Sequence, residues 1–314
     1  MLLEFEHVSK CYPGDVWANR DVSLGVEAGE VFGVLGPNGA GKTTLIAQLL
    51  GVARPTSGRI VMDGVDVVRR PDVARQACSY QPQTQVPVTG LTPMQAVTLA
   101  GRVRHGRGPD VRRRAHELLQ LLDLREWERK AVPLSGGVLR LVAFCMAAVE
   151  PGRVVVLDEP TNDVDPLRRK LLWQQVRALA DRGSAVLLVT HNVLEAERCV
   201  DRLAIIDQGR VVATGTPAKL KAELRAPLRL ELGLDLEASS PTFPAFVRRP
   251  AATRGRVVAE VAVADAGAAA AWAVGLQEEG AILEFLLAPA SLEDVYVRRV
   301  GVSLEEEASA ARVG

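Results

Sequence analysis

The residues best suited to chemistry in this chain lie in the segment GPNGAGKTT, residues 36–44. This segment follows an aliphatic run and opens a helical pattern, which is the context that the phosphate-binding pattern GxxxxGK[ST] requires. Its glycines let backbone N–H groups surround phosphates, and the helix N-terminus adds partial positive charge. Lys42 adds a full positive charge, and we expect the Thr43 hydroxyl to be a ligand for Mg²⁺. The predicted binding residues are Gly36, Pro37, Asn38, Gly39, Ala40, Gly41, Lys42, Thr43 and Thr44.

Two adjacent acidic residues, Asp158 and Glu159, follow the aliphatic run VVVL, with Asp158 116 residues after Lys42. Ligands of open α/β sheets bind at the carboxyl ends of the strands, where this pair would lie. Asp158 is then placed to hold Mg²⁺ through water, and Glu159 to polarise a nucleophilic water. Adjacent acids at a strand end are often only solvated surface, but a phosphate loop in the same chain makes that alternative the weaker one.

The elements that must position these residues form an α/β pattern up to about Leu220. Buried strands are predicted at residues 30–36, 153–160, 185–191 and 202–207, with helices covering both faces of a parallel sheet. Residues 58–67 predict an antiparallel hairpin around Asp63-Gly64. The strand signal disappears between about residues 88 and 150, which predicts a helical insertion.

A second, smaller α/β domain is predicted beyond the first. We expect domains at residues 1–222 and 226–302, followed by a tail at 303–314. The second domain reads as β-β-α-β-α, and the turn-rich residues 237–255 read as a loop.

Composition limits the function classes. Lys+Arg and Asp+Glu both total 38, so the chain lacks the basic excess of a non-specific nucleic-acid binder. The four cysteines form no CxxC pair, which favours reduced thiols in the cytosol. The first ten residues do not resemble a signal peptide, and the longest apolar runs are shorter than the ~20 residues that span a bilayer. We therefore expect a soluble protein that acts at a membrane only through a partner.

The segment LSGG, residues 134–137, places Ser135, Gly136 and Gly137 directly before an apolar helical run. Serine is a favourable N-cap, but two glycines in a first turn are poor helix formers. Either the turn needs room, or another group approaches its backbone closely.

With its motifs in this order, the chain resembles the ATPase subunits of ABC transporters over roughly residues 2–220. The resemblance implies a P-loop NTPase fold: a RecA-like parallel sheet, an antiparallel β subdomain and the helical insertion. SYQPQ resembles the Q-loop, in which Gln83 would contact Mg²⁺ and sense the membrane partner. LSGG resembles the signature motif and TNDVD the D-loop that contains Asp163, while His191 resembles the switch histidine. Tyr12 corresponds to the aromatic residue that stacks on adenine.

For some of these residues an ordinary structural role stays open. Tyr12 is also compatible with a packed surface aromatic, and Trp17 is a weaker candidate for the stack. An isolated histidine such as His191 is usually a satisfied core or surface residue. The arginine-rich stretch from Arg102 to Arg114 could face lipid headgroups, although a solvated face is the better interpretation.

The resemblance also implies how the site works. Two cassettes close head to tail on ATP and Mg²⁺, and the Ser-Gly-Gly turn of one meets the γ-phosphate held by the other. A β-carbon at Gly136 or Gly137 would obstruct that approach. Glu159, His191 and Gln83 would be catalytic, and Thr43, Gln83 and Asp158 would hold the metal. The expected partners are a second ATPase subunit, in a homodimer or heterodimer, and a separate permease on the inner face of the membrane that docks near residues 84–106. No nucleic acid is expected.

This chain departs from the family pattern where Val138 and Leu139 follow LSGG in place of Gln and a basic residue. One lost neutral hydrogen bond weakens closure or affinity by at most roughly tenfold, so we expect a working ATPase. A heteromeric assembly with one better signature is an alternative, as is a subunit that binds ATP but scarcely hydrolyses it.

The ending ASLEDVYVRRVG resembles drug-resistance ATPases such as the daunorubicin exporter subunit, which favours export. A soluble ABC protein of translation or DNA repair is disfavoured, because those proteins carry tandem cassettes or a long coiled-coil insertion.

Overall fold

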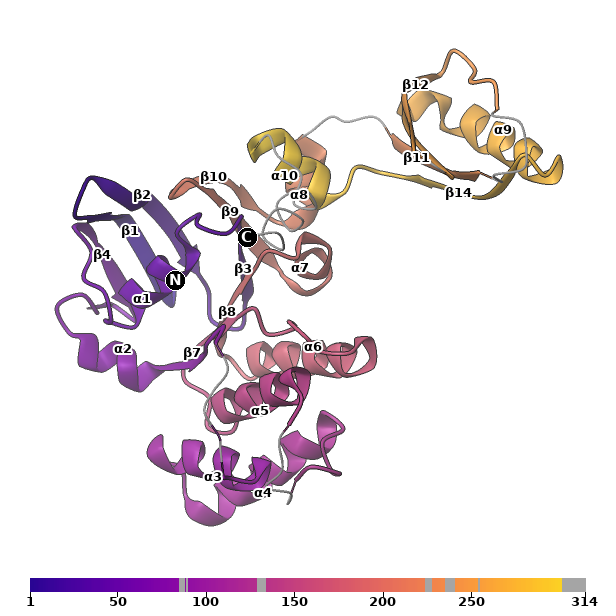
Figure 1. Ribbon diagram of the computed structural model, residues 1–314. Helices are drawn as coiled ribbons and strands as arrows, with labels where there is room; N and C mark the ends of the chain where they lie inside the picture. The colour runs from indigo at the N-terminus through magenta and orange to yellow at the C-terminus, as the bar shows by residue number, and fades with distance from the viewer. Residues whose placement is uncertain are drawn as a thin grey trace. The chain divides into compact units, whose positions relative to one another are not determined.

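The computed structural model in Figure 1 describes residues 1–84, 88, 90–128, 134–223, 228–234, 241–253 and 255–300. The chain divides into two compact units: Met1–Pro217 together with Arg299 and Val300, and Ala218–Arg298. No helix in the described part of the chain has both the length and the apolar character needed to cross a bilayer.

A six-stranded sheet forms the centre of the first unit, in the order β10-β9-β3-β8-β7-β6. Its parallel strands are β3 (Val31–Leu35), β6 (Cys78–Gln81), β7 (Val154–Asp158), β8 (Ala185–Thr190) and β9 (Arg202–Asp207). The edge strand β10 (Arg210–Gly215) is antiparallel to β9. Every residue of β3, β7 and β8 is buried, as expected for strands covered on both faces. The four strands predicted from aliphatic runs are thus confirmed.

The parallel arrangement gathers the predicted site at one edge of this sheet. The phosphate loop, residues 36–44, follows the end of β3, and Gln83 follows the end of β6. Asp158 ends β7, while His191 comes directly after the end of β8. Because the carboxyl ends of parallel strands share an edge, residues far apart in sequence meet there.

A second, antiparallel sheet in the same unit has the order β2-β1-β4-β5. Its strands are β1 (Leu3–Tyr12), β2 (Val16–Val26), β4 (Ser57–Met62) and β5 (Val65–Asp66). The predicted hairpin is confirmed, since Val61 pairs with Asp66 and Met62 with Val65. Asp63 and Gly64 both have positive φ, 51° and 78°, as the type I′ turn of a two-residue hairpin demands.

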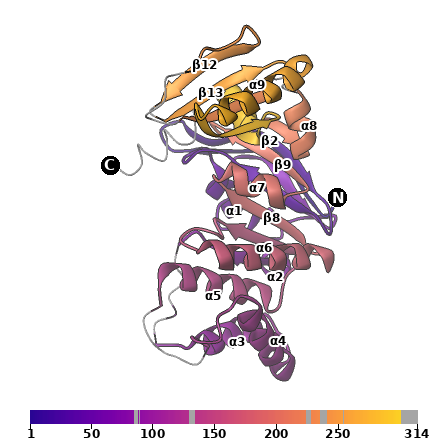
Figure 2. The same ribbon diagram turned by 90° about the vertical axis from the view of Figure 1, so that its right-hand side faces the viewer.

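Helices complete the first unit. They are α1 (Lys42–Leu49), α2 (Pro71–Ala77), α3 (Pro93–Val103), α4 (Gly108–Leu121), α5 (Gly136–Ala148), α6 (Pro166–Asp181) and α7 (Val193–Cys199). In Figures 1 and 2, α3 and α4 lie together at one end of this unit, and α5 contacts both of them as well as β6 and β7. The described residues between 88 and 150 contain no strand, which agrees with the predicted helical insertion.

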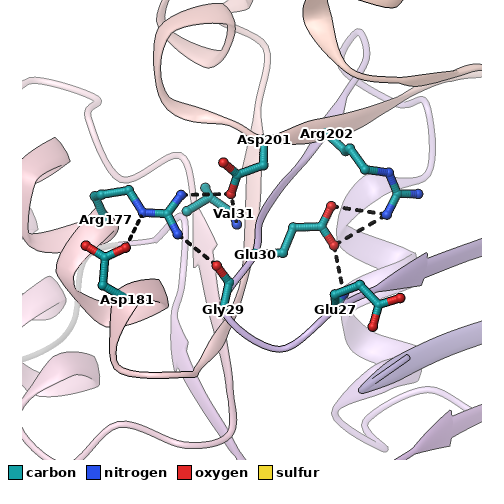
Figure 3. A network of polar contacts seen from close by, with 8 residues as sticks. All are labelled: Glu27, Gly29, Glu30, Val31, Arg177, Asp181, Asp201 and Arg202. Carbon is teal, nitrogen blue, oxygen red and sulfur yellow. Dashed lines mark hydrogen bonds and ion pairs between the residues drawn. The ribbon is translucent and has the colours of Figure 1, made fainter.

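A polar network anchors the opposite, amino-terminal edge of the parallel sheet, as Figure 3 shows. Arg177 on α6 donates hydrogen bonds to Asp181 at 2.9 Å, to Asp201 at 2.8 Å and to the Gly29 carbonyl at 2.8 Å. Asp201 also accepts the Val31 N–H at 2.8 Å, so the first residue of β3 is tied to the turn before β9.

A neighbouring ion pair in Figure 3 joins the starts of the same two strands. Arg202 lies 3.1 Å from Oε1 of Glu30, a carboxylate that is only 7% exposed. The other oxygen of Glu30 accepts the Glu27 N–H at 2.7 Å. The loop between β2 and β3 is thereby fixed to the sheet.

The helix α8 (Pro217–Glu223) leads into the second unit, whose sheet has the order β12-β13-β11-β14. The strands β11 (Leu228–Leu234), β12 (Val247–Thr253), β13 (Arg256–Val261) and β14 (Ile282–Ala288) are all antiparallel. A short 3₁₀ turn (Val263–Asp265), α9 (Ala266–Glu278) and α10 (Leu292–Val300) accompany them. Leu230, Leu232 and Val257 belong to its core, which also includes Ala269 and Ala273 of α9.

One expectation for this unit was wrong. The order is β-β-β-α-β-α, because β12 lies in the segment that the sequence analysis assigned to a loop. Only Val247 of β12 is buried, so the strand lacks the alternating pattern that would reveal it. Pro250 also argues against a strand, but β12 is an edge strand with an irregular register between Arg248 and Ala251, where proline is tolerated. The predicted tail, 303–314, lies outside the described residues.

Candidate active site

A cavity of about 220 Å³ opens at the carboxyl edge of the parallel sheet. Its wall unites the phosphate loop with Gln83, Asp158 and Glu159, as the sequence analysis expected. The lining residues are Ala18, Asn38, Gly39, Gly41, Lys42, Thr43, Thr44, Gln83, Asp158 and Glu159. Ser135, Gly136, Gly137, Asp163, Tyr12 and His191 are not among them.

The phosphate loop is held from outside by β2. Gly41 has φ +100°, and a β-carbon there would lie 2.0 Å from the Ala18 carbonyl oxygen. The Asn19 side chain donates to the Gly41 carbonyl at 3.1 Å and accepts a hydrogen bond from Gln48 at 2.6 Å. The sequence analysis missed Ala18, Asn19 and Gln48, because the pairing of β2 with this loop leaves no local pattern.

Lys42, the first residue of α1, extends its side chain back to the phosphate loop. Its side chain is buried, and Nζ donates to the Gly36 carbonyl at 2.6 Å and to the Pro37 carbonyl at 2.8 Å. These bonds hold the ammonium group beside the cavity, where it can meet phosphate oxygens.

Asp158 is an almost fully buried carboxyl group. Burial, with a smaller contribution from the charge of Glu159, raises the pKa of Asp158 to about 6, although Lys42 and Arg140 act in the opposite direction. Tyr80 donates to Oδ2 at 3.4 Å. A cation at this position would favour the charged form.

Thr43, Gln83 and Asp158 offer a hydroxyl, an amide and a carboxylate to the same cavity. Mg²⁺ prefers oxygen ligands and is usually bound by one or two carboxylates together with substrate phosphates and water. This donor set therefore fits Mg²⁺.

Glu159 is fixed more tightly than its neighbour. It has φ +51°, and its N–H bonds to the Val189 carbonyl at 2.8 Å. Its carboxylate accepts the Thr190 hydroxyl at 3.0 Å and the His191 N–H at 2.9 Å, and it lies 2.6 Å from His191 Nδ1. His191 does not line the cavity itself but contacts Glu159, which does.

Ser135 caps α5, as the sequence predicted: its hydroxyl accepts the Val138 N–H at 3.4 Å. Packing within this chain requires glycine at position 137, because a β-carbon there would lie 2.3 Å from the Asp163 carbonyl oxygen. The Asp163 backbone is thus one group that approaches this turn closely, within the same chain. Val138 is itself buried.

The two aromatic candidates lie at the turn between β1 and β2. Tyr12 is 40% exposed with the Lys10 ammonium 4.9 Å from its ring centroid, and Trp17 is 41% exposed with Arg20 at 5.6 Å. Ala18 in β2, the neighbour of Trp17, lines the cavity, whereas Tyr12 and Trp17 do not.

Known proteins that are similar to this chain show which family it belongs to. Residues 19–162 match the family described as ABC transporter. The Nod factor export ATP-binding protein I of Paraburkholderia xenovorans (strain LB400) is 34% identical over 311 residues, covering 97% of this chain and 98% of the relative. The daunorubicin resistance ATP-binding protein DrrA3 of Streptomyces coeruleorubidus is 41% identical over 211 residues, 67% of each chain.

Solved structures agree with the sequence relatives. The ATP-binding subunit of an ABC transporter superposes with a TM-score of 0.66 at 29% identity, covering 71% of this chain and 93% of that one. A dimeric bacterial ABC transporter cassette gives 0.62 at 25% identity, covering 68% and 98%. The chain belongs to the ABC transporter family and is one of its ATP-binding, ATP-hydrolysing cassettes.

Proposed function

We propose that this cassette hydrolyses Mg²⁺–ATP at a site completed by a second ATPase subunit and so drives export through a separate membrane subunit. The observation that carries the proposal is the cavity in which the phosphate loop, Gln83, Asp158 and Glu159 meet. It combines a polyphosphate cradle, an oxygen donor set for Mg²⁺ and a carboxylate held by a histidine.

Nucleotide binding would begin at the phosphate loop. Backbone N–H groups and Lys42 would receive the phosphates, since the loop opens α1 and the helix N-terminus favours anions. Thr43, Gln83 and Asp158 would hold Mg²⁺, which neutralises phosphate charge when bound. Tyr12 would stack on the adenine ring from the edge of β1.

Hydrolysis needs a water aligned with the γ-phosphorus and a group that takes its proton. Glu159 is that group in our proposal. Thr190 and His191 fix the orientation of its carboxylate, and the His191 ring lies within 2.6 Å to stabilise it. The water oxygen forms the new bond to phosphorus while the bond to the ADP oxygen breaks.

A second ATPase subunit would supply the residues that the cavity lacks. Ser135, Gly136, Gly137 and Asp163 belong to the proposed site yet lie outside the cavity wall of their own chain. In a head-to-tail dimer they would face the γ-phosphate of the partner. The similarity to a dimeric cassette supports this arrangement, and either a homodimer or a heterodimer would satisfy it.

Export and a membrane partner are supported by the relatives. The Nod factor export ATP-binding protein matches nearly the whole chain, including the second unit, and the drug-resistance relative matches two thirds of it. We propose that this chain works on the cytoplasmic face of the membrane, bound to a permease that recognises the cargo.

Phosphate release by the purified protein, compared with a Glu159→Gln variant, tests the enzymatic part. The variant keeps the size of the side chain but removes the base, so the rate should fall about 10²–10⁴-fold while ATP binding persists. Equal rates would refute hydrolysis at this site and leave an ATP-gated subunit with little turnover.

A further inference from the structure

Arg140 is a buried positive charge that no sequence motif singled out. It lies in the second turn of α5, its residue is 8% exposed, and its guanidinium is turned toward the Q-loop. Nη1 donates to the Pro82 carbonyl at 3.0 Å and to the Gln83 carbonyl at 2.6 Å. An arginine near the nucleotide site thus binds the backbone of the residue proposed to contact Mg²⁺.

A further hydrogen bond joins the same two segments, with the donor now on the β6 side. Gln81, the last residue of β6, donates its side-chain amide to the Arg140 carbonyl at 3.2 Å. Gln81 is completely buried, so this bond is shielded from water. The end of β6 and the start of α5 are therefore joined by a side chain from each.

The position of these bonds matters because β6 ends at Gln81. Beyond it, neighbouring strands no longer fix the backbone that carries Gln83. A charge-assisted hydrogen bond to the carbonyl of a residue restricts its peptide plane and so the direction of its side chain. The same helix begins at Ser135, the turn proposed to face the second ATPase subunit.

We propose that Arg140 is a positioning residue: it holds the Gln83 side chain at the magnesium–phosphate site and fixes the position of the Q-loop relative to α5. The inference rests on the proposed function, since it assigns Gln83 to the metal.

Arg104 provides a matched control. It donates to the Cys78 carbonyl at 2.6 Å, to the Gln76 carbonyl at 3.2 Å and to the Glu150 carbonyl at 2.8 Å. The chemistry is the same, an arginine bound to backbone carbonyls, but it acts at the start of β6 rather than after its end. Arg104 does not line the cavity.

The experiment measures ATP affinity by calorimetry, with Mg²⁺ and with EDTA, in a Glu159→Gln background that prevents turnover. Arg140→Met should reduce the gain in affinity that Mg²⁺ provides by about five- to tenfold, while affinity in EDTA changes by less than about twofold. Arg140→Lys should recover part of the gain, because lysine can still donate to one carbonyl. Arg104→Met should lower thermal stability and leave the gain intact.

A double-mutant cycle tests whether Arg140 acts through Gln83. In a Gln83→Ala background, Arg140→Met should remove little further Mg²⁺-dependent affinity. Equal losses in Mg²⁺ and EDTA, or fully additive losses, would refute the positioning role. Failure of the Glu159→Gln background itself to bind ATP would instead refute the proposed function.

Discussion

At the scale of single residues, the candidate site buries a carboxyl group, Asp158, at the position where we propose that Mg²⁺ binds. Asp158 is buried beside a second carboxylate, and both its burial and the charge of Glu159 disfavour the ionised form. A bound cation would relieve the cost, which is consistent with a role for Asp158 in holding Mg²⁺.

Asp158→Asn should therefore stabilise the nucleotide-free protein more at neutral pH than at acidic pH. The folded pKa, about 6, lies above the ordinary value of 3.8. Well below pH 3.8 the carboxyl group is protonated in both states and the cost is absent; the cost grows as pH rises above 3.8 and reaches its full size above pH 6. We expect a gain of roughly 1–2 kcal/mol at pH 7.5. Urea unfolding at pH 4.5 and 7.5 measures it, and an equal gain at both pH values would contradict the assignment.

Gly137→Ala should destabilise the chain even without nucleotide. The added β-carbon would meet the Asp163 carbonyl oxygen at 2.3 Å, so the D-loop must move at a cost of about 1–3 kcal/mol. Gly275→Ala in α9 is the control: nothing lies within 4 Å there, and alanine should stabilise the helix by about 0.5–1 kcal/mol. Thermal unfolding compares them, and an unchanged Gly137→Ala monomer would refute the intrachain role.

The sequence was informative about residues whose role is local. Lys42, Asp158 and Glu159 stand in contiguous patterns that the chemistry requires. Asn19 and Arg140 escaped notice because each acts on a backbone carbonyl of a distant segment. Only the fold brings β2 to the phosphate loop, or α5 to the Q-loop.

At the scale of elements, burial decided which strands could be predicted. The strands β3, β7 and β8 are covered on both faces and therefore read as continuous aliphatic runs. The exposed edge strand β12 carries arginines and a proline, so its sequence resembles a loop. The ion pairs at the amino-terminal edge were not predicted either, because Arg202 and Glu30 lie far apart in the chain.

Arg202→Met should lower the free energy of unfolding by about 1–3 kcal/mol, because it leaves the buried Glu30 carboxylate without its partner. Methionine preserves much of the packing of the side-chain stem, so the loss reports the charge. Arg70→Met, which breaks an ion pair that is more than half exposed on both sides, should change stability little. Similar losses for both variants in urea unfolding would contradict a special role for the buried pair.

At the scale of the whole molecule, our proposal gives each chain one half of each of two shared sites. One half is the cavity with its phosphate loop, and the other is the capped turn of Ser135 to Gly137 at the start of α5. The cassette fold and its motifs could be predicted from sequence, because phosphate binding restricts residue types strictly. The cargo could not, since nothing in the cavity or the motifs selects one.

A mixing experiment tests the shared site most directly. Lys42→Ala removes the phosphate-loop cation, and Ser135→Phe blocks the capped turn, so either variant alone should release almost no phosphate. In a mixed dimer the intact loop of the Ser135→Phe subunit meets the intact turn of the Lys42→Ala subunit. Mixing equal amounts should then restore about a quarter of the wild-type rate, since half of the dimers carry one sound site. A mixture as inactive as its components, or full activity of Ser135→Phe alone, would contradict a site built from two copies.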